Sequence, residues 1–281
     1  MFERLSRSWD LVKASGAVLK QDKALLVFPL ISSIAAIGVV AAFALPMFAM
    51  GGFDVLSRGR EVSLLHYALG FLFYVVEYFV VFYFNAALVS AAMIRLDGGD
   101  PTVRDGLSIA SSKAGSILGY ALIAATAGMV LRAIQERVGF LGRIVVGLVG
   151  IGWSLATFLV VPVLVARNVG PVEAVRDSAE LLKRTWGENV IGHGGIGVAF
   201  GLIFFAVIIT GAALIIGAAL SENMGLVAVA VALVIIAAAT TILLQSALSG
   251  IYSAALYRYA TTNEGTSGFS ALALGSAFRP K

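Results

Sequence analysis

Long apolar stretches alternate with short charged segments along the chain. Six of these stretches approach or exceed the length of a membrane span, at about residues 24–50, 64–94, 115–131, 144–166, 190–217 and 225–257. A bilayer core of ~30 Å is crossed by about 20 helical residues, so each stretch can form one transmembrane helix. The pattern predicts an all-α fold, a polytopic membrane helix bundle of six transmembrane helices in a single domain over residues 1–281.

Shorter segments with both charged and apolar residues lie between or beside the spans. They cover about residues 4–20, 102–114, 172–187 and 267–278. Their spacing predicts amphipathic helices that lie in the cytoplasmic membrane interface, with Trp9 and Trp186 as anchors in the headgroup layer. The alternative is that these helices pack on the bundle without touching lipid.

Lysine and arginine are distributed unevenly between the two sides of the predicted bundle. Fifteen of the 20 fall in the N-terminal segment, the C-terminal tail and the segments around 95–114 and 167–189, and five fall in the opposite loops. Positively charged short loops are retained in the cytoplasm. This ratio predicts that the N- and C-termini are both cytoplasmic.

Three of the predicted spans end at an arginine, at Arg95, Arg167 and Arg258. The hexapeptides Ser90–Arg95 and Ser253–Arg258 are nearly the same, and a Val-Arg-Asp triplet follows each of the first two arginines at the same spacing. These matches predict a threefold internal repeat, in which each unit consists of an interfacial helix followed by a hairpin of two spans.

Several segments resemble an uncharacterised prokaryotic membrane-protein family. They are Arg7–Lys13, Asp22–Leu30, Gly170–Ala174 and Gly268–Lys281, so the resemblance extends over essentially the whole chain. It implies the architecture described above and a location in a bacterial or archaeal plasma membrane, but no activity. The chain is more distantly similar to the six-helix membrane domain fused to some glycerophosphodiester phosphodiesterases, whose catalytic barrel has no counterpart here.

Composition excludes several classes of protein. Hydrophobic residues make up 59% of the chain and charged residues 13%, which is incompatible with a water-soluble domain, and the absence of cysteine excludes disulfides and thiolate metal sites. The net charge of +4 is explained by topology, so no nucleic-acid partner is expected.

Recognisable enzyme motifs are incomplete. Gly152–Ala156 lacks the second glycine of a serine-nucleophile motif, and Asp97, Asp100 and Asp105 lack the further aspartates that would hold a metal pair. We therefore expect no catalytic residue, no metal site and no cofactor.

Glu77 is the only acidic residue inside a predicted span, near the middle of the second one. Such a residue is a functional candidate, although Tyr74 or Tyr78 could simply hydrogen-bond its carboxyl group. His66, on nearly the same helix face, and Asn85 and Gln245 complete the candidates for a ligand or ion path. Interhelical packing is the alternative for Asn85 and Gln245.

Arg95, Arg167 and Arg258 are candidates for binding lipid headgroups, and the alternative is that they only fix topology. The leading hypothesis is a non-enzymatic membrane protein that organises or senses the bilayer or scaffolds other proteins. The expected partners are membrane lipids and, for a scaffold, other membrane proteins. The alternative is a small transporter or channel that uses Glu77 and a polar stripe on the last helix.

Overall fold

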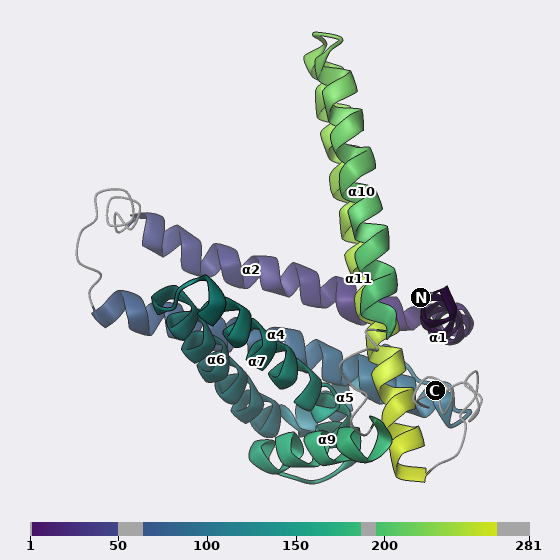
Figure 1. Cartoon of the computed structure of the whole chain (residues 1–281). Helices are drawn as coiled ribbons and strands as arrows, with labels where there is room; N and C mark the ends of the chain where they lie inside the picture. The colour runs from purple at the N-terminus through teal and green to yellow at the C-terminus, as the bar shows by residue number, and fades with distance from the viewer. Residues whose placement is uncertain (1, 50–63, 187–194, 263–281) are drawn as a thin grey trace. The chain divides into compact units, whose positions relative to one another are not determined.

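The computed structural model describes residues 2–49, 64–186 and 195–262, and every regular element within them is helical (Figure 1). The elements are α1 (Phe2–Gln21), η1 (Lys23–Leu26), α2 (Val27–Ala49), α4 (Leu64–Leu96), α5 (Val103–Ser112), α6 (Ala114–Arg137), α7 (Phe140–Ala156), α8 (Val160–Ala166), α9 (Pro171–Trp186), α10 (Gly195–Ala219) and α11 (Met224–Thr262). The predicted all-α fold is confirmed.

Six helical segments of the described residues are long and apolar enough to cross a membrane. They are Lys23–Phe48, Leu64–Leu96, Ala114–Arg137, Phe140–Ala166, Phe200–Ala219 and Met224–Thr262. Large apolar side chains are exposed along most of them, as expected for surfaces that face lipid rather than water. The protein is thus a multi-pass membrane protein, as the hydrophobic pattern predicts.

Two of the helices are longer than a bilayer requires. At 1.5 Å per residue, the 33 residues of α4 extend ~50 Å and the 39 residues of α11 extend ~58 Å, against a hydrocarbon core of ~30 Å. Each helix therefore reaches well beyond the hydrocarbon core, and the last turns of each can take part in structure outside it.

The third and sixth spans continue beyond their predicted ends. Helix α6 runs to Arg137 rather than to residue 131, and α11 runs to Thr262 rather than to residue 257. In α6 the charges do not end the helix because Arg132 pairs with Glu136, one turn further on, with Nε and Oε1 3.1 Å apart. Its guanidinium group also donates to the hydroxyl oxygen of Tyr74 on α4, 3.0 Å away.

The fourth span begins earlier than predicted, at Phe140 instead of residue 144, and it is not one continuous helix. Helix α7 ends at Ala156 and α8 begins at Val160. The cause is Pro162, which has no N–H to donate to the carbonyl group four residues earlier and whose ring crowds that carbonyl. Phe158 and Leu159 therefore leave the regular hydrogen-bond pattern, since the N–H of Phe158 bonds to the carbonyl oxygen of Leu155 and that of Leu159 bonds to the hydroxyl group of Ser178.

The chain divides into two compact units. One comprises Met1–Leu26, Ala92–Asp100 and Thr185–Lys281, and the other comprises Val27–Ala91 and Pro101–Arg184. A single domain over residues 1–281 stays a prediction.

In the first unit, α10 and α11 run side by side as a hairpin (Figure 1), and α1 contacts both of them. The two hairpin helices approach closely at Gly211, where a Cβ atom would lie 2.9 Å from the side chain of Val234. A glycine is needed at this position because the neighbouring helix occupies the space of a side chain.

In the second unit, α6 lies at the centre of the contacts, since it touches α5, α7 and α8. Stacked rings of Phe82 and Tyr120, with centroids 4.5 Å apart, join α4 to α6. The rings of Phe43 and Phe73 meet edge to face at 5.5 Å and join α2 to α4. Aromatic contacts thus hold this unit together along its spans.

The three described connecting helices each bury one face within the protein. The buried residues are Ser15, Val18 and Leu19 in α1, Gly106 and Ala110 in α5, and Ala174, Ser178 and Leu182 in α9. Their spacing of three or four residues is that of one helix face. This burial favours the alternative in which the helices pack on the spans, while a location in the membrane interface stays a prediction.

The fourth predicted amphipathic helix, residues 267–278, lies outside the described residues, as do the loop that contains Arg58 and Arg60 and the first residues of the fifth predicted span.

Candidate functional site

Among the described residues, the longest buried runs precede the three repeated arginines. Every residue of 86–92, 159–164 and 251–257 is buried. The internal repeat itself stays a prediction, but its three motifs share this property. Each arginine therefore follows a rigid, packed segment at the end of a membrane-spanning helix.

Arg95 lies in the last turn of α4, and a tight turn at Gly98 ends the helix directly after it. Gly98 has a φ of +86°, which only glycine adopts readily, and its N–H bonds to the carbonyl oxygen of Arg95 at 3.0 Å. The guanidinium group of Arg95 pairs with Asp100 at 3.0 Å and donates to the carbonyl oxygen of Gln21 at 3.4 Å. This arginine thus joins the end of α4 to the end of α1.

Arg258 lies in the same unit and reaches the same turn. Its guanidinium group pairs with Asp97, one residue beyond the end of α4. The Nε atom of Arg258 is buried and has no hydrogen-bond partner among the described residues. The turn between Asp97 and Asp100 is thus held by two arginines, one adjacent in sequence and one from the end of α11.

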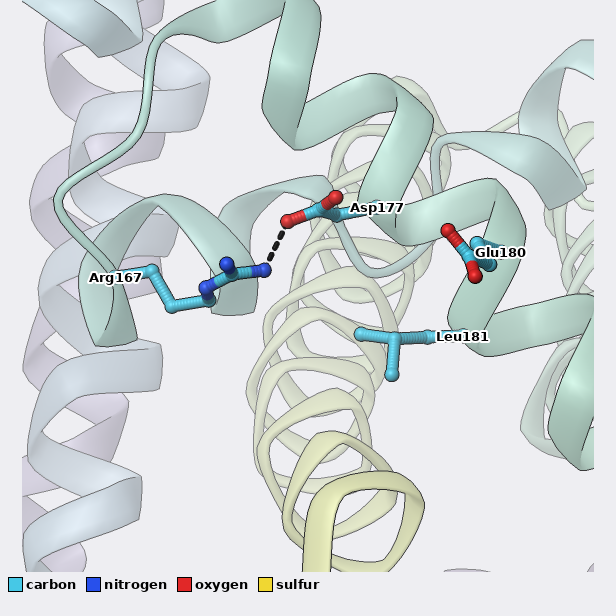
Figure 2. Close-up of a pocket in the computed structure, with 4 residues that line it drawn as sticks. All are labelled: Arg167, Asp177, Glu180 and Leu181. Carbon is cyan, nitrogen blue, oxygen red and sulfur yellow. Dashed lines mark hydrogen bonds and ion pairs between the residues drawn. The ribbon is translucent and has the colours of Figure 1, made fainter.

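Arg167 lies in the other unit, directly beyond α8, and pairs with Asp177 on α9 (Figure 2). Together with Glu180 and Leu181 these two residues line a cavity of about 190 Å³ between the end of α8 and α9. We call this cavity the α8–α9 pocket. The described residues of its wall offer a guanidinium group, two carboxylates and one apolar side chain.

The chain between α8 and α9 is tied to the start of α6. The ammonium group of Lys113 donates to the carbonyl oxygen of Arg167 at 3.3 Å and to Oδ1 of Asn168 at 3.2 Å. The Ser116 hydroxyl donates to the carbonyl oxygen of Val169 at 3.4 Å. These bonds fix the backbone that carries Arg167, so the pocket is built on an ordered connection.

Asp105 occupies the repeat position that Asp177 occupies in the second motif, but it has a different partner. It forms a capping box with Thr102 at the start of α5, with 2.9 Å between the Thr102 nitrogen and its carboxylate. These hydrogen bonds from Thr102 lower the pKa of Asp105 below its usual value. The two motifs therefore use an equivalent aspartate for different purposes.

Glu77 is half-buried on α4. Its Oε2 atom is buried and has no hydrogen-bond partner within the part of the chain that the structure describes. Neither Tyr74 nor Tyr78 therefore bonds to this oxygen, and the hydroxyl oxygen of Tyr74 accepts a hydrogen bond from Arg132. Whether Glu77 has a functional role stays a prediction.

The other candidates for a ligand or ion path are separated between the units. His66 and Asn85 are half-buried on α4, and Gln245 is half-buried on α11. A common path through Asn85 and Gln245 stays a prediction, because α11 and this part of α4 belong to different units. The side chains of Trp9 and Trp186 lie outside the described residues.

Arg95, Arg167 and Arg258 share a pairing that sequence reasoning did not anticipate, since each binds an aspartate. Part of their positive charge is thereby neutralised, which weakens the argument for a basic ring that binds anionic headgroups. Arg167 belongs to a different unit from the other two, so a convergence of all three also stays a prediction.

Ser178 is a second residue that sequence reasoning missed. It is completely buried on α9, where its hydroxyl group donates to the carbonyl oxygen of Ala156 at 2.7 Å and accepts from the N–H of Leu159 at 3.0 Å. It thereby satisfies two backbone groups at the break between α7 and α8. The signal in the sequence for this requirement was Pro162, inside the fourth predicted span, because a proline interrupts the hydrogen bonds of a helix.

Comparison with known proteins gives one match. Residues 64–269 match the model of a family of unknown function, DUF6159. No curated protein and no solved structure matches the chain. The expected resemblance to an uncharacterised family is confirmed, whereas the distant similarity to the membrane domain of glycerophosphodiester phosphodiesterases stays a prediction.

Proposed function

The chain belongs to this family of unknown function, and we propose that it binds bilayer lipids at the arginine ends of its spans. In this proposal it has no enzymatic activity, and lipid binding lets it sense or organise the membrane in which it lies. Scaffolding of other membrane proteins through the same face is compatible with this role.

The position of the α8–α9 pocket carries this proposal. Ala166 is the last residue of a membrane-spanning segment, and Arg167, the next residue, lines the pocket. The ends of spans lie where the headgroups of a bilayer begin. A polar cavity at this position faces headgroups at high local concentration, so lipid is the most abundant candidate ligand.

The orientation that we propose places this face in the cytoplasm of a prokaryotic cell. The excess of lysine and arginine on the predicted side that holds Arg95, Arg167 and Arg258 together with the N-terminal segment supports it, fifteen against five on the other side. Six crossings then put both termini on the same side. The lipids that we propose to bind at the arginine ends of the spans are therefore those of the inner leaflet of the plasma membrane.

Native mass spectrometry tests the proposal. The protein would be extracted with its surrounding lipids into nanodiscs, transferred to a mild detergent and measured for retained lipid. We expect one or more phospholipids to stay bound after most of the lipid is removed. The proposal fails if no lipid is retained and if addition of the protein leaves the packing of lipid vesicles unchanged.

A second function, transport of an ion or small solute, is favoured by one observation. The buried Oε2 atom of Glu77 has no hydrogen-bond partner in the described part of the chain, and an unsatisfied carboxyl group within a span needs a proton or a cation. Flux across vesicles that contain the protein would be compared with flux for Glu77→Gln. Equal flux for the two proteins, or no flux for either, removes this function.

A further inference from the structure

We propose that Glu77 binds a proton inside the membrane, so that its side chain is a neutral carboxylic acid in a bilayer at pH 7. This inference goes beyond lipid binding at the arginine ends of the spans and does not depend on it. Where the second function, transport, holds, the inference names the ion as a proton.

Glu77 lies at the edge of the face of α4 that packs on α6. Tyr74, three residues earlier, accepts a hydrogen bond of 3.0 Å from Arg132 of α6. The hydroxyl oxygen of Tyr78 lies 3.5 Å from the position that a Cβ atom at Gly128 of α6 would take. The two helices therefore run in opposite directions, and Glu77 lies between these two contacts. The three residues of α6 between Gly128 and Arg132 are all apolar.

Glu77 also borders the face of α4 that packs on α2. Phe73, one turn earlier and about 40° away around the helix, meets Phe43 of α2 edge to face at 5.5 Å. The two helices run side by side in opposite directions (Figure 1). Val39 precedes Phe43 by one turn, and both are half-buried between exposed neighbours, so they share the face that α2 turns towards α4. The residue of α2 at the level of Glu77 is therefore apolar.

The ionised groups nearest to the level of Glu77 compensate each other. They are Arg132 and Glu136 on α6, which pair with Nε and Oε1 3.1 Å apart. Tyr74 and Tyr78 are its titratable neighbours on α4, and the described part of α2 carries no titratable side chain. The Oε2 atom of Glu77 is buried and has no hydrogen-bond partner among the described residues.

An ionised carboxylate in such surroundings is costly, and a proton removes the charge. A divalent metal ion such as Ca²⁺ or Mg²⁺ needs about six or more oxygen ligands, which the apolar residues of α2 and α6 at this level do not supply. A proton needs a single oxygen atom. It is therefore the ligand that fits the position of Glu77.

A lipid-soluble carbodiimide detects a protonated carboxyl group, because its reaction takes up the acid proton. This proton moves to one nitrogen of the reagent while the carboxylate oxygen bonds to the central carbon, which gives an O-acylisourea. The acyl group then moves from this oxygen to the second nitrogen, and a stable N-acylurea remains. Every atom of the reagent is retained, so the protein gains the mass of one carbodiimide.

The experiment treats the full-length protein in lipid nanodiscs with dicyclohexylcarbodiimide and locates the adduct by peptide mass spectrometry. We expect an adduct at Glu77, formed at a rate that falls by less than about twofold from pH 6 to pH 7. A carboxyl group with the ordinary pKa of glutamate, about 4.3, would lose about tenfold in this interval. Glu77→Gln should remove the adduct. Glu173→Gln, the same change at an exposed residue of α9, should leave it unchanged.

An infrared spectrum of the unmodified protein gives a second readout that does not depend on access of the reagent. In maltoside micelles, which contain no carbonyl groups, the wild type at pH 7 should show the carbonyl band of a protonated carboxyl group, and Glu77→Gln should lose it. If the reagent yields no adduct, this band decides. Its presence in the wild type and its loss in Glu77→Gln support the inference, and its absence overturns the inference.

Two other outcomes also overturn proton binding. One is a tenfold fall in the labelling rate from pH 6 to pH 7. The other is protection of Glu77 by sodium or potassium ions at constant pH, which would assign a metal cation instead. Thermal unfolding of both variants checks that the fold is intact. Neither readout involves lipid retention, so lipid binding stands or fails separately, and labelling without flux removes transport but leaves this inference.

Discussion

The hydroxyl group of Ser178 donates a hydrogen bond of 2.7 Å to the carbonyl oxygen of Ala156, at the point where α7 ends. The same hydroxyl group accepts a bond from the N–H of Leu159, just before α8 begins. Helix α9 therefore supplies the polar partners that the break in the fourth span has lost. The break and the connecting helix depend on each other.

Ser178→Ala is expected to destabilise the protein. It removes the partner of the buried N–H of Leu159 and of the part-buried carbonyl group of Ala156, and a buried unsatisfied group costs roughly 1–3 kcal/mol. The measurement is the free energy of unfolding in mixed micelles as the fraction of denaturing detergent rises. Ser112→Ala is the control, because that exposed serine bonds to the carbonyl oxygen of Ile109 in its own helix, and it should change stability by less than about 0.5 kcal/mol.

Gly106→Ala should also be destabilising, because α5 approaches its neighbours closely at this residue. A Cβ atom there would lie 2.5 Å from the carbonyl oxygen of Ala87 and 2.7 Å from the ring of Phe28. Relief of this overlap requires a shift of backbone, with an expected loss of about 1–3 kcal/mol.

Gly115→Ala is the matched control for this prediction. A Cβ atom at Gly115 meets nothing within 4 Å, so the substitution should be neutral or should stabilise α6 by about 0.5–1 kcal/mol. If the two variants unfold at the same detergent concentration, α5 does not pack as closely against α4 and α2 at Gly106 as described, and the prediction is contradicted.

The capping box of α5 predicts a pH dependence. Hydrogen bonds from Thr102 lower the pKa of Asp105 in the folded protein, so the folded state favours the charged carboxylate. The resulting stabilisation is fully present above the unfolded pKa of about 3.9 and is lost as the pH falls through the lower folded pKa. Wild type should therefore exceed Asp105→Asn in stability at pH 6, and the difference should shrink towards pH 3.

The matched variant for this titration is Thr102→Ala, which removes the donor and leaves the carboxylate in place. It should bring the pKa of Asp105 back towards its ordinary value. A stability difference between wild type and Asp105→Asn that stays constant from pH 6 to pH 3 would contradict the capping box.

The absence of cysteine from the chain allows a direct test of orientation. Ser112→Cys and Ser221→Cys place single thiols at exposed positions at the end of α5 and between α10 and α11. With cytoplasmic termini, a membrane-impermeant maleimide should label only Ser221→Cys in intact cells. It should label Ser112→Cys in inverted membrane vesicles, and the reverse pattern would place the arginine ends of the spans outside the cytoplasm.

The spans and the arginines at their ends could be predicted from the sequence because both depend on local composition. Apolar stretches of fixed length identify the spans, whereas the ion pair between Arg167 and Asp177 was not anticipated. The end of the third span was set too early, because the charge of Arg132 was taken as a boundary although Glu136 and Tyr74 satisfy it. Local sequence does not show such partners.

The polar contacts that build the candidate site could not be predicted for a related reason. Ser178 bonds to residues about twenty positions earlier, and Lys113 bonds to a carbonyl group more than fifty positions later. Both hydrogen bonds depend on how the helices pack in space, and the pattern of hydrophobic residues along the chain does not show this packing. Asp105 and Asp177 end triplets of the same sequence, yet Asp105 caps α5 with Thr102 while Asp177 pairs with Arg167.

The most direct test of the account is whether the α8–α9 pocket meets the headgroup layer of a bilayer. A fluorophore attached to Leu181→Cys in nanodiscs would be exposed in turn to lipids that carry a quencher on the headgroup or deep in the acyl chain. We predict strong quenching by the headgroup label and weak quenching by the acyl-chain label. If neither label quenches the fluorophore, the pocket lies away from the lipid, and lipid binding at this end of the spans is contradicted.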